Sequence, residues 1–321
     1  MSEMQAAILA APGTIRIDRV AVPTAGAGEV LVKLEGCGVC ASSLEPWAGN
    51  EWIHYPGDAG GLGHEGWGVI EALGPDVADL AVGDRVAALS YKSFAEYDVA
   101  RADAVVRLPA SLAGQPFPGE PLGCAMNIFR RSDITAGQTV AIVGIGFLGA
   151  VLTRLATDAG ARIIAISRRE SSLALAREYG AAETIAMNDH YAIIEQVKAL
   201  TGGTLCDRVI EAVGKQWPLD LAGELVREGG KLIVAGYHQD GPRQVNMQMW
   251  NWKGIDVINA HERDPAVALR GMREAVDAVA SGRIDPRPLY THRFPLDQLG
   301  AALDGTRDKP DDMVKALVLF P

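Results

Sequence analysis

The sequence lacks several features that mark specialised classes of protein. Its four cysteines, Cys37, Cys40, Cys124 and Cys206, form no disulfide framework, so we expect a reducing compartment. No run of about 18 apolar residues occurs, which argues against a membrane span. Positive charge is scarce, because 30 Lys and Arg stand against 40 Asp and Glu for a formal net charge of -10. Such a surface is unfavourable for binding nucleic acid or anionic membranes.

The first residues also lack a basic region followed by an apolar core, so we expect no signal peptide and a cytoplasmic location. What the chain has in quantity is glycine, with 36 residues in an otherwise ordinary globular composition that is 48% hydrophobic. A length of 321 residues predicts two domains. These observations together favour a protein that acts on a small molecule.

The pattern of apolar residues changes near residue 136. Before it, short strands at 29–35, 68–74 and 83–88 lie between Gly and Pro turns, which indicates a compact, mostly β domain. After it, apolar strands alternate with helical segments. We expect strands at 139–143, 162–166, 208–212, 231–235 and 255–259, and helices at 148–159, 171–179 and 218–227. This alternation predicts an α/β domain with a parallel sheet covered on both faces.

The chain end is predicted to rejoin the first domain. An amphipathic helix at 265–281 is followed by a strand at 314–319, after the α/β sheet is already complete. We therefore assign residues 1–125 and 263–321 to the first domain and 126–262 to the second.

A glycine fingerprint lies between the first strand and the first helix of the second domain. Glycines permit a tight turn and close approach of a pyrophosphate, which the helix N-terminus then attracts. An ordinary strand–helix turn is the alternative interpretation. The fingerprint predicts a dinucleotide cofactor held by Gly144, Gly146, Phe147, Leu148 and Gly149.

The residues after the next strand indicate which dinucleotide is preferred. Folds that bind NAD usually carry Asp or Glu there, hydrogen-bonded to the ribose 2′-hydroxyl. This chain has Ser167, Arg168 and Arg169, which can bind a 2′-phosphate. Glu170 counts weakly against this interpretation, and solvated arginines are the alternative. We predict a preference for NADP(H) over NAD(H).

Three separate segments supply side chains that bind metals. They contribute Cys40, the pair His64 and Glu65, and Glu120. Thiolate, imidazole and carboxylate all suit zinc, and three ligands with an open position are typical of a catalytic zinc. The alternative is that these are unconnected turn and core residues. A Lewis acid beside a dinucleotide predicts hydride transfer to or from an alcohol or carbonyl.

Together these features resemble the medium-chain dehydrogenase/reductase superfamily, in its zinc-dependent alcohol and polyol (sorbitol-like) dehydrogenase branch. The resemblance covers nearly the whole chain and implies a GroES-like catalytic domain with a Rossmann domain. The matching stretches are 36–42, 63–70, 83–86, 94–97, 120–122, the glycine fingerprint, 211–214 and 314–316.

The resemblance also implies roles for single residues. Cys40 and His64 are implied zinc ligands, Glu65 a ligand or an exchanging one, and Glu120 the third ligand, in a Glu-Pro-Leu form that resembles the polyol group. Ser42 falls where the family hydrogen-bonds the substrate oxygen, and Glu45 falls where a relay histidine is common. With His64, these two make up the predicted catalytic residues, although a solvated carboxylate is an equal alternative for Glu45. Val213 and Lys315 are further predicted cofactor contacts.

Two departures from the family pattern affect the metal. The Asp that commonly supports the ligand histidine is Ser43 here, so either zinc binds more weakly or another group orients His64. The four-cysteine lobe that holds a structural zinc in many members is missing between Val86 and Phe94. We therefore expect one catalytic zinc and no structural zinc.

The substrate is expected to be a secondary alcohol or ketone, of polyol, cyclitol or sugar-like type. Aromatic and polar residues in the loop after Cys40 suit such a ring, although loop packing explains them equally well: Trp47, Trp52, His54 and Tyr55. An apolar cluster at Met247–Trp252 suggests a homodimer or homotetramer. The rival functions are a zinc-free enoyl or quinone reductase on the same scaffold and, more remotely, a non-enzymatic nucleotide-binding protein.

Overall fold

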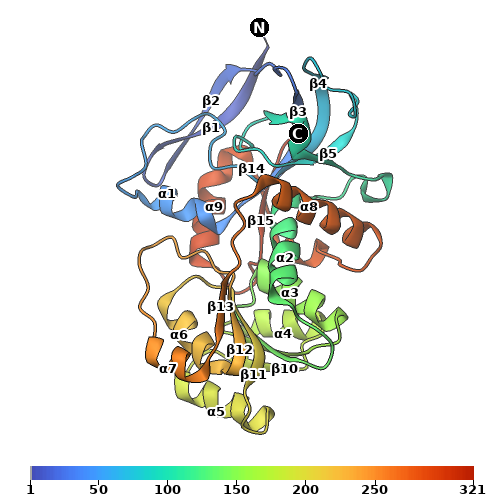
Figure 1. The fold of residues 1–321 in the computed structure, drawn as a ribbon. Coiled ribbons are helices and arrows are strands. Elements are labelled where there is room, and N and C mark those ends of the chain that lie inside the picture. The colour runs from blue at the N-terminus through green and yellow to red at the C-terminus, as the bar shows by residue number, and fades with distance from the viewer. Residues whose placement is uncertain (1) are drawn as a thin grey trace. The chain divides into compact units, whose positions relative to one another are not determined.

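The computed structural model describes residues 2–321, and the chain divides into two compact units (Figure 1). One unit comprises Met1–Gly123 and Asp264–Pro321, and the other comprises Cys124–Arg263. The first is mostly β and the second is a parallel α/β layer structure, as predicted for GroES-like and Rossmann domains. Within the described residues no helix has the length and apolar character needed to cross a membrane.

A seven-stranded sheet organises the first unit, in the order β14-β15-β3-β4-β5-β7 with β6 also paired to β3. The C-terminal strand β15 pairs antiparallel with β3, which confirms that the chain end returns to this unit. The strands are β3 (Glu29–Gly38), β4 (Gly66–Leu73), β5 (Arg85–Ala88), β6 (Tyr97–Arg101), β7 (Val105–Arg107), β14 (His292–Pro295) and β15 (Ala316–Leu319).

A hairpin and four helices complete this unit. The hairpin of β1 (Glu3–Ala11) and β2 (Thr14–Ala21) was not predicted, although Pro12-Gly13 at its tip is a turn signal and Gly13 has φ 65°. The predicted amphipathic helix is confirmed as α8 (Pro265–Ala280), with the Asp264 side chain accepting a hydrogen bond from the Ala266 N–H. The other helices are α1 (Leu44–Ala48), α9 (Leu299–Asp308) and α2 (Gly119–Ser132), of which α2 continues into the second unit.

The second unit is built on a six-stranded parallel sheet in the order β10-β9-β8-β11-β12-β13. The order reverses between β8 and β11, which is the switch point where open α/β sheets bind ligands. The strands are β8 (Thr139–Val143), β9 (Arg162–Ser167), β10 (Glu183–Ala186), β11 (Cys206–Glu211), β12 (Val226–Val234) and β13 (Asp256–Asn259). Each strand predicted for this domain is therefore present.

Helices cover both faces of this sheet (Figure 1). They are α3 (Phe147–Asp158) and α4 (Glu170–Glu178) on one side, with α5 (His190–Leu200), α6 (Gln216–Leu225) and α7 (Met247–Lys253) on the other. Alternate residues of the central strands point to opposite faces, so that Ala141 and Ile164 join the core under α5 and α6. Their neighbours Ile142 and Ile163 are equally buried.

One predicted boundary in this domain is wrong. The strand expected from residue 231 begins at Val226, and α6 ends at Leu225 where the helix was expected to reach 227. The register of β12 against β11 shifts between the pairs Cys206–Val226 and Arg208–Lys231. Gly229, at φ 64°, lets the strand bulge at this point. Because a glycine pair inside an apolar strand resembles a turn in the sequence, the strand was predicted to begin only after it.

The centre of the first sheet depends on a close approach between β3 and β4. Gly36 lies opposite Trp67, whose ring is buried. A Cβ atom on Gly36 would lie 2.5 Å from the Trp67 ring and 2.8 Å from the Val318 carbonyl oxygen of β15. Only glycine therefore leaves room for the indole between the three strands.

We expect Gly36→Ala to lower the free energy of unfolding by about 1–3 kcal/mol, the usual cost of overpacking a core. Denaturant unfolding of the two proteins measures this difference. In a Trp67→Phe background the same substitution should cost less, because part of the clash is gone. An equal cost in both backgrounds would contradict the packing explanation.

Candidate metal and cofactor site

The pairing of β3 with β4 brings the first metal-ligating side chains together. Cys40 follows β3, and its Sγ accepts a hydrogen bond from the Ser42 N–H at 3.5 Å. His64 and Glu65 immediately precede β4, and the Gly38 N–H donates to the Glu65 carbonyl at 3.2 Å. Within the described residues, one group of three offers ligand atoms all within 4.8 Å of one another, namely Cys40, His64 and Glu65.

This donor set fits a zinc ion. Tetrahedral ligands at the usual zinc bond lengths lie about 3.3–3.8 Å apart, so the three groups need only small movements to close on a metal. Glu65 is completely buried and pairs with Lys315, whose Nζ lies 2.6 Å from Oε1 and 2.5 Å from Oε2. The Lys315 ammonium also donates to the Val39 carbonyl at 3.1 Å. A buried cation thus already balances one carboxylate of the set.

The His64 ring is oriented by a backbone carbonyl. Its Nδ1 lies 2.9 Å from the Leu62 carbonyl oxygen, and its Nε2 lies 3.5 Å from Ser42 Oγ. A carbonyl only accepts, so Nδ1 carries a proton in either charge state of the ring, and Nε2 is the nitrogen that can bind a metal once its own proton has left. Ser43 Oγ donates to the same carbonyl at 3.3 Å, and Leu62 has φ 71°. The Leu62 carbonyl therefore occupies the supporting position for which the family pattern suggests an aspartate.

The charges around His64 favour a bound cation. Burial lowers the pKa of His64, but the Cys40 hydrogen bond and charge, with the charges of Glu120 and Glu65, raise it to about 10. These charges attract a proton to the imidazole as they would attract a metal cation. A metal must displace that proton to bind, so metal affinity at this site depends on pH.

Glu120 lies in the first turn of α2, near this cluster but outside the group of three. Its charge is among those that raise the pKa of both His64 and Lys315. A Cβ on Gly119 would lie 2.7 Å from Ala87 Cβ, so the start of α2 packs tightly on β5. The role of Glu120 as a ligand stays a prediction.

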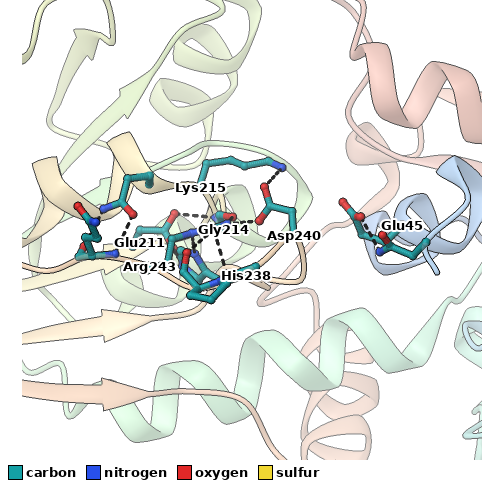
Figure 2. A network of polar contacts seen from close by, with 12 residues as sticks. Glu45, Glu211, Gly214, Lys215, His238, Asp240 and Arg243 are labelled. Atoms are coloured by element: carbon teal, nitrogen blue, oxygen red, sulfur yellow. Dashed lines mark hydrogen bonds and ion pairs between the residues drawn. The ribbon is translucent and has the colours of Figure 1, made fainter. Parts of the chain in front are cut away.

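The residues predicted for proton transfer lie next to the ligands in sequence. Ser42 belongs to a 3-10 turn at Ala41–Ser43, and its hydroxyl approaches His64 as described. Glu45 is in the first turn of α1, not in a loop, and its Oε2 accepts from Asn50 Nδ2 at 2.8 Å (Figure 2).

Some of the aromatic residues in and after α1 are packed into the domain, and others are exposed. Trp47 is buried, and its Nε1 donates to Asp304 of α9 at 2.9 Å. The Tyr55 hydroxyl donates to the Pro46 carbonyl at 2.6 Å. Packing therefore accounts for these two, whereas Trp52 is 64% exposed and remains free to meet a ligand.

The glycine fingerprint has the geometry of a phosphate-binding turn. Gly144 has φ 100°, and a Cβ on Gly149 would lie 2.1 Å from the Gly144 carbonyl oxygen, so both positions require glycine. Gly146 precedes α3, and no atom lies within 4 Å of where its Cβ would be. Open space in front of a helix N-terminus is what a pyrophosphate needs. The buried Phe147 and the half-buried Leu148 begin the helix.

The other predicted cofactor residues have different environments. Ser167 is buried at the end of β9, Arg168 is exposed, and Arg169 precedes α4. Val213 is 38% exposed, and its Cγ2 would lie 2.4 Å from a Cβ on Gly144. Lys315 is buried in the pair with Glu65, so its cofactor contact stays a prediction.

Sequence reasoning missed a polar network at the carboxyl ends of β11 and β12. Glu211, the last residue of β11, is completely buried and contacts His238, which in turn contacts Arg243 (Figure 2). The motif at 211–214 was noted, but only as part of a resemblance. A carboxylate ending an apolar strand was the available signal, because a buried charge requires partners.

Comparison with known proteins identifies both units. Residues 26–110 match the family model described as alcohol dehydrogenase GroES-like domain, and residues 148–280 match that of zinc-binding dehydrogenase. L-galactonate-5-dehydrogenase of Escherichia coli (strain K12) is 24% identical, with all of both chains covered. Sorbitol dehydrogenase of Bacillus subtilis (strain 168) is 26% identical, covering 98% of this chain and 97% of the relative.

Solved structures agree with this assignment. A zinc-binding dehydrogenase from Sinorhizobium meliloti 1021 bound to NADP is 26% identical, with a TM-score of 0.86 over 100% of both chains. The two family models match consecutive parts of the chain, and the relatives align over nearly its whole length. Both comparisons therefore indicate the same family. The chain belongs to the zinc-dependent alcohol and polyol dehydrogenase branch of the medium-chain dehydrogenase/reductase superfamily, and it is an oxidoreductase of the alcohol dehydrogenase class.

Proposed function

We propose that the protein is a zinc-dependent dehydrogenase that transfers a hydride between NADP(H) and a secondary alcohol or ketone of polyol, cyclitol or sugar-like type. The observation that carries this proposal is the convergence of Cys40, His64 and Glu65 within 4.8 Å. A zinc-free reductase has no use for such a set. The first unit is then the catalytic domain, which we assign to 1–125 and 263–321, and 126–262 binds the cofactor.

Zinc would be held by Cys40, His64 and Glu120, with Glu65 as a further or exchanging ligand. When bound, it polarises the substrate oxygen as a Lewis acid while the nicotinamide exchanges the hydride. Leu62 and Ser43 keep the Nε2 lone pair of His64 directed at the metal position. Lys315 holds Glu65 in its buried place and limits the cost of burying that charge.

The chain's own hydroxyl and carboxyl groups would move the substrate proton. Ser42 Oγ lies beside His64 Nε2, so a substrate oxygen at the metal would be within reach of this hydroxyl. A hydroxyl both donates and accepts, and it therefore passes a proton on without holding charge. Glu45 is the proposed next acceptor, in the half-buried turn that follows Ser42.

Several features support the finer parts of the proposal. The polyol class rests on the Glu120-Pro121-Leu122 form and on the names of relatives such as sorbitol dehydrogenase. The NADP(H) preference rests on Ser167, Arg168 and Arg169 in place of an acidic residue, and on the NADP-bound relative. A homodimer or homotetramer is supported by the edge strand β13 and the exposed apolar residues Met247, Trp252 and Val257.

The purified protein should contain about one zinc per chain and should oxidise polyols or cyclitols with NADP+. A strong chelator should abolish this activity, and added zinc should restore it, because the metal supplies the Lewis acid. Elemental analysis and the rate of NADPH formation measure both quantities.

Matched cysteine variants separate the metal site from general damage. Cys40→Ser should lose both zinc and activity, whereas Cys206→Ser, at a buried cysteine of β11, should keep both. A zinc content near two per chain would contradict the single-site expectation. Activity on an enoyl or quinone substrate that survives chelation would favour the zinc-free alternative.

The kcat/KM with NADPH should exceed that with NADH. Arg168→Ala should lower kcat/KM for NADPH about tenfold and leave NADH nearly unchanged, because a charge-assisted contact to the 2′-phosphate is lost. Arg177→Ala, which removes a charge further along α4, serves as the control. A wild-type preference for NADH would disprove the assignment of this arginine.

Glu45→Gln should lower kcat about tenfold and shift its pH profile, because the amide cannot take up the proton. Steady-state rates between pH 5 and 10 measure both effects. The neighbouring exposed Glu51→Gln should behave as wild type. A Glu45→Gln profile that coincides with the wild type would exclude the relay.

A further inference from the structure

Glu211 is a buried carboxylate that takes no part in the proposed chemistry. It ends β11 at the switch-point side of the sheet, pairing with Val143 of β8 and Val234 of β12. Its Oε1 accepts from the Val213 N–H at 2.7 Å and from the Gly214 N–H at 2.8 Å. Its own carbonyl accepts from the N–H groups of Ala235 and Gly236, both at 2.8 Å. One residue thus joins the turn after β11 to the turn after β12.

The second carboxylate oxygen fixes the state of a histidine. Glu211 Oε2 lies 3.0 Å from His238 Nε2, and Arg243 Nε donates to His238 Nδ1 at 2.8 Å. An arginine Nε–H only donates, so Nδ1 must be the acceptor and the proton must sit on Nε2. His238 is therefore neutral, in the Nε2–H tautomer, and donates to Glu211 (Figure 2).

Further contacts connect the outer residues of this network to one another. Arg243 Nη2 donates to the Gly214 carbonyl at 3.0 Å and also pairs with Asp240. Lys215 Nζ lies 2.6 Å from Asp240 Oδ2, and the Lys215 and Arg243 hydrogen bonds lower the pKa of Asp240 to about 2. Two carboxylates and two cations surround the neutral imidazole, so the charges within this network balance one another.

The turn held in this way touches the glycine fingerprint. Gly214 has φ 81°, and a Cβ on Gly236 would lie 2.2 Å from the Gly214 nitrogen, so the two turns pack backbone against backbone. Val213, whose N–H is bound by Glu211, contacts Gly144 through its side chain. Contacts through Val213 therefore connect the network to the glycine fingerprint across the switch point, where ligands bind in such sheets.

We infer that Glu211, His238 and Arg243 are positioning residues that hold the Val213–Gly214 turn against Gly144 and thereby set the affinity for the nicotinamide dinucleotide. The inference rests on the cofactor site proposed above. These residues bind backbone groups and one another, so their effect on the cofactor passes through Val213. A turn that is already ordered before binding loses less conformational entropy when the cofactor binds, which favours binding.

Glu211→Gln is the most direct test. The amide nitrogen would donate to His238 Nε2, which would move the imidazole proton to Nδ1, where it meets the Arg243 donor. We expect the dissociation constant of NADPH, measured by fluorescence titration, to rise about tenfold. KM for the cofactor should rise in parallel with little change in kcat, and amide hydrogen exchange in 236–243 should become faster. Nitrogen-15 NMR of His238 should show the Nε2–H tautomer in the wild type only.

Variants at His238 guard against simple misfolding. His238→Gln retains a donor and an acceptor and should keep most of the affinity, whereas His238→Leu removes both and should behave like Glu211→Gln. The matched control is Asp207→Asn, which breaks contacts with Arg227 and with the Thr139 N–H at the opposite end of β11. Its cofactor affinity should equal that of the wild type.

The outcomes distinguish this inference from the proposed function. Wild-type protein that binds neither NADPH nor NADH would disprove the proposed function itself. Wild-type protein that binds the cofactor, with unchanged affinity and exchange in Glu211→Gln, would overturn only the positioning role. Equal losses in Glu211→Gln and Asp207→Asn would also overturn it, because they would indicate a general loss of stability.

Discussion

The antiparallel pairing of β3 with β4 is the constraint on which the metal-ligating cluster depends. Cys37 lies opposite Gly66, so the residues just beyond this pair on each strand, Cys40 and the segment His64–Glu65, emerge at the same end. β15 adds to the other edge of β3, and Lys315 directly precedes it. Three segments far apart in the chain are thereby placed by one sheet. The Trp67 ring seated over Gly36 prevents the strands from shifting, since a different register would bring side chains into that space.

Electrostatics explains how the charges of the cluster are balanced. Acidic groups gathered in a partly buried place would repel one another if all of them were ionised. Lys315 offsets Glu65, and the neighbouring Cys40, Glu120 and Glu65 raise the pKa of His64 despite its burial, so that this imidazole favours the protonated form. The same charges favour a metal cation, which would have to displace the proton in order to bind.

Most strands and helices could be predicted from the sequence, whereas the functional contacts made by backbone groups could not. Apolar runs at residues 139–143 and 162–166 predicted β8 and β9 because buried parallel strands are continuously hydrophobic. The hairpin β1–β2 was missed although β1 is largely buried, because four of the nine residues of β1 are alanine, a residue depleted in strands. For the candidate site, residue types identified Cys40 and His64. The carbonyl of Leu62 that orients His64 carries no residue-type signal, and its position follows from a left-handed backbone at φ 71°.

Two completely buried glutamates, Glu65 and Glu211, have different partners and therefore different roles. Glu65 is balanced by the ammonium of Lys315, which also donates to the Val39 carbonyl. A side-chain partner of this kind can be shared with a metal ligand without any change in the backbone. Glu211 is balanced by two backbone N–H groups and a neutral imidazole whose tautomer Arg243 fixes. Backbone donors cannot move away without unfolding the turn, so Glu211 is permanently committed to structure. The kind of partner, more than the depth of burial, therefore separates a carboxylate available for ligand exchange from one that shapes the protein around it.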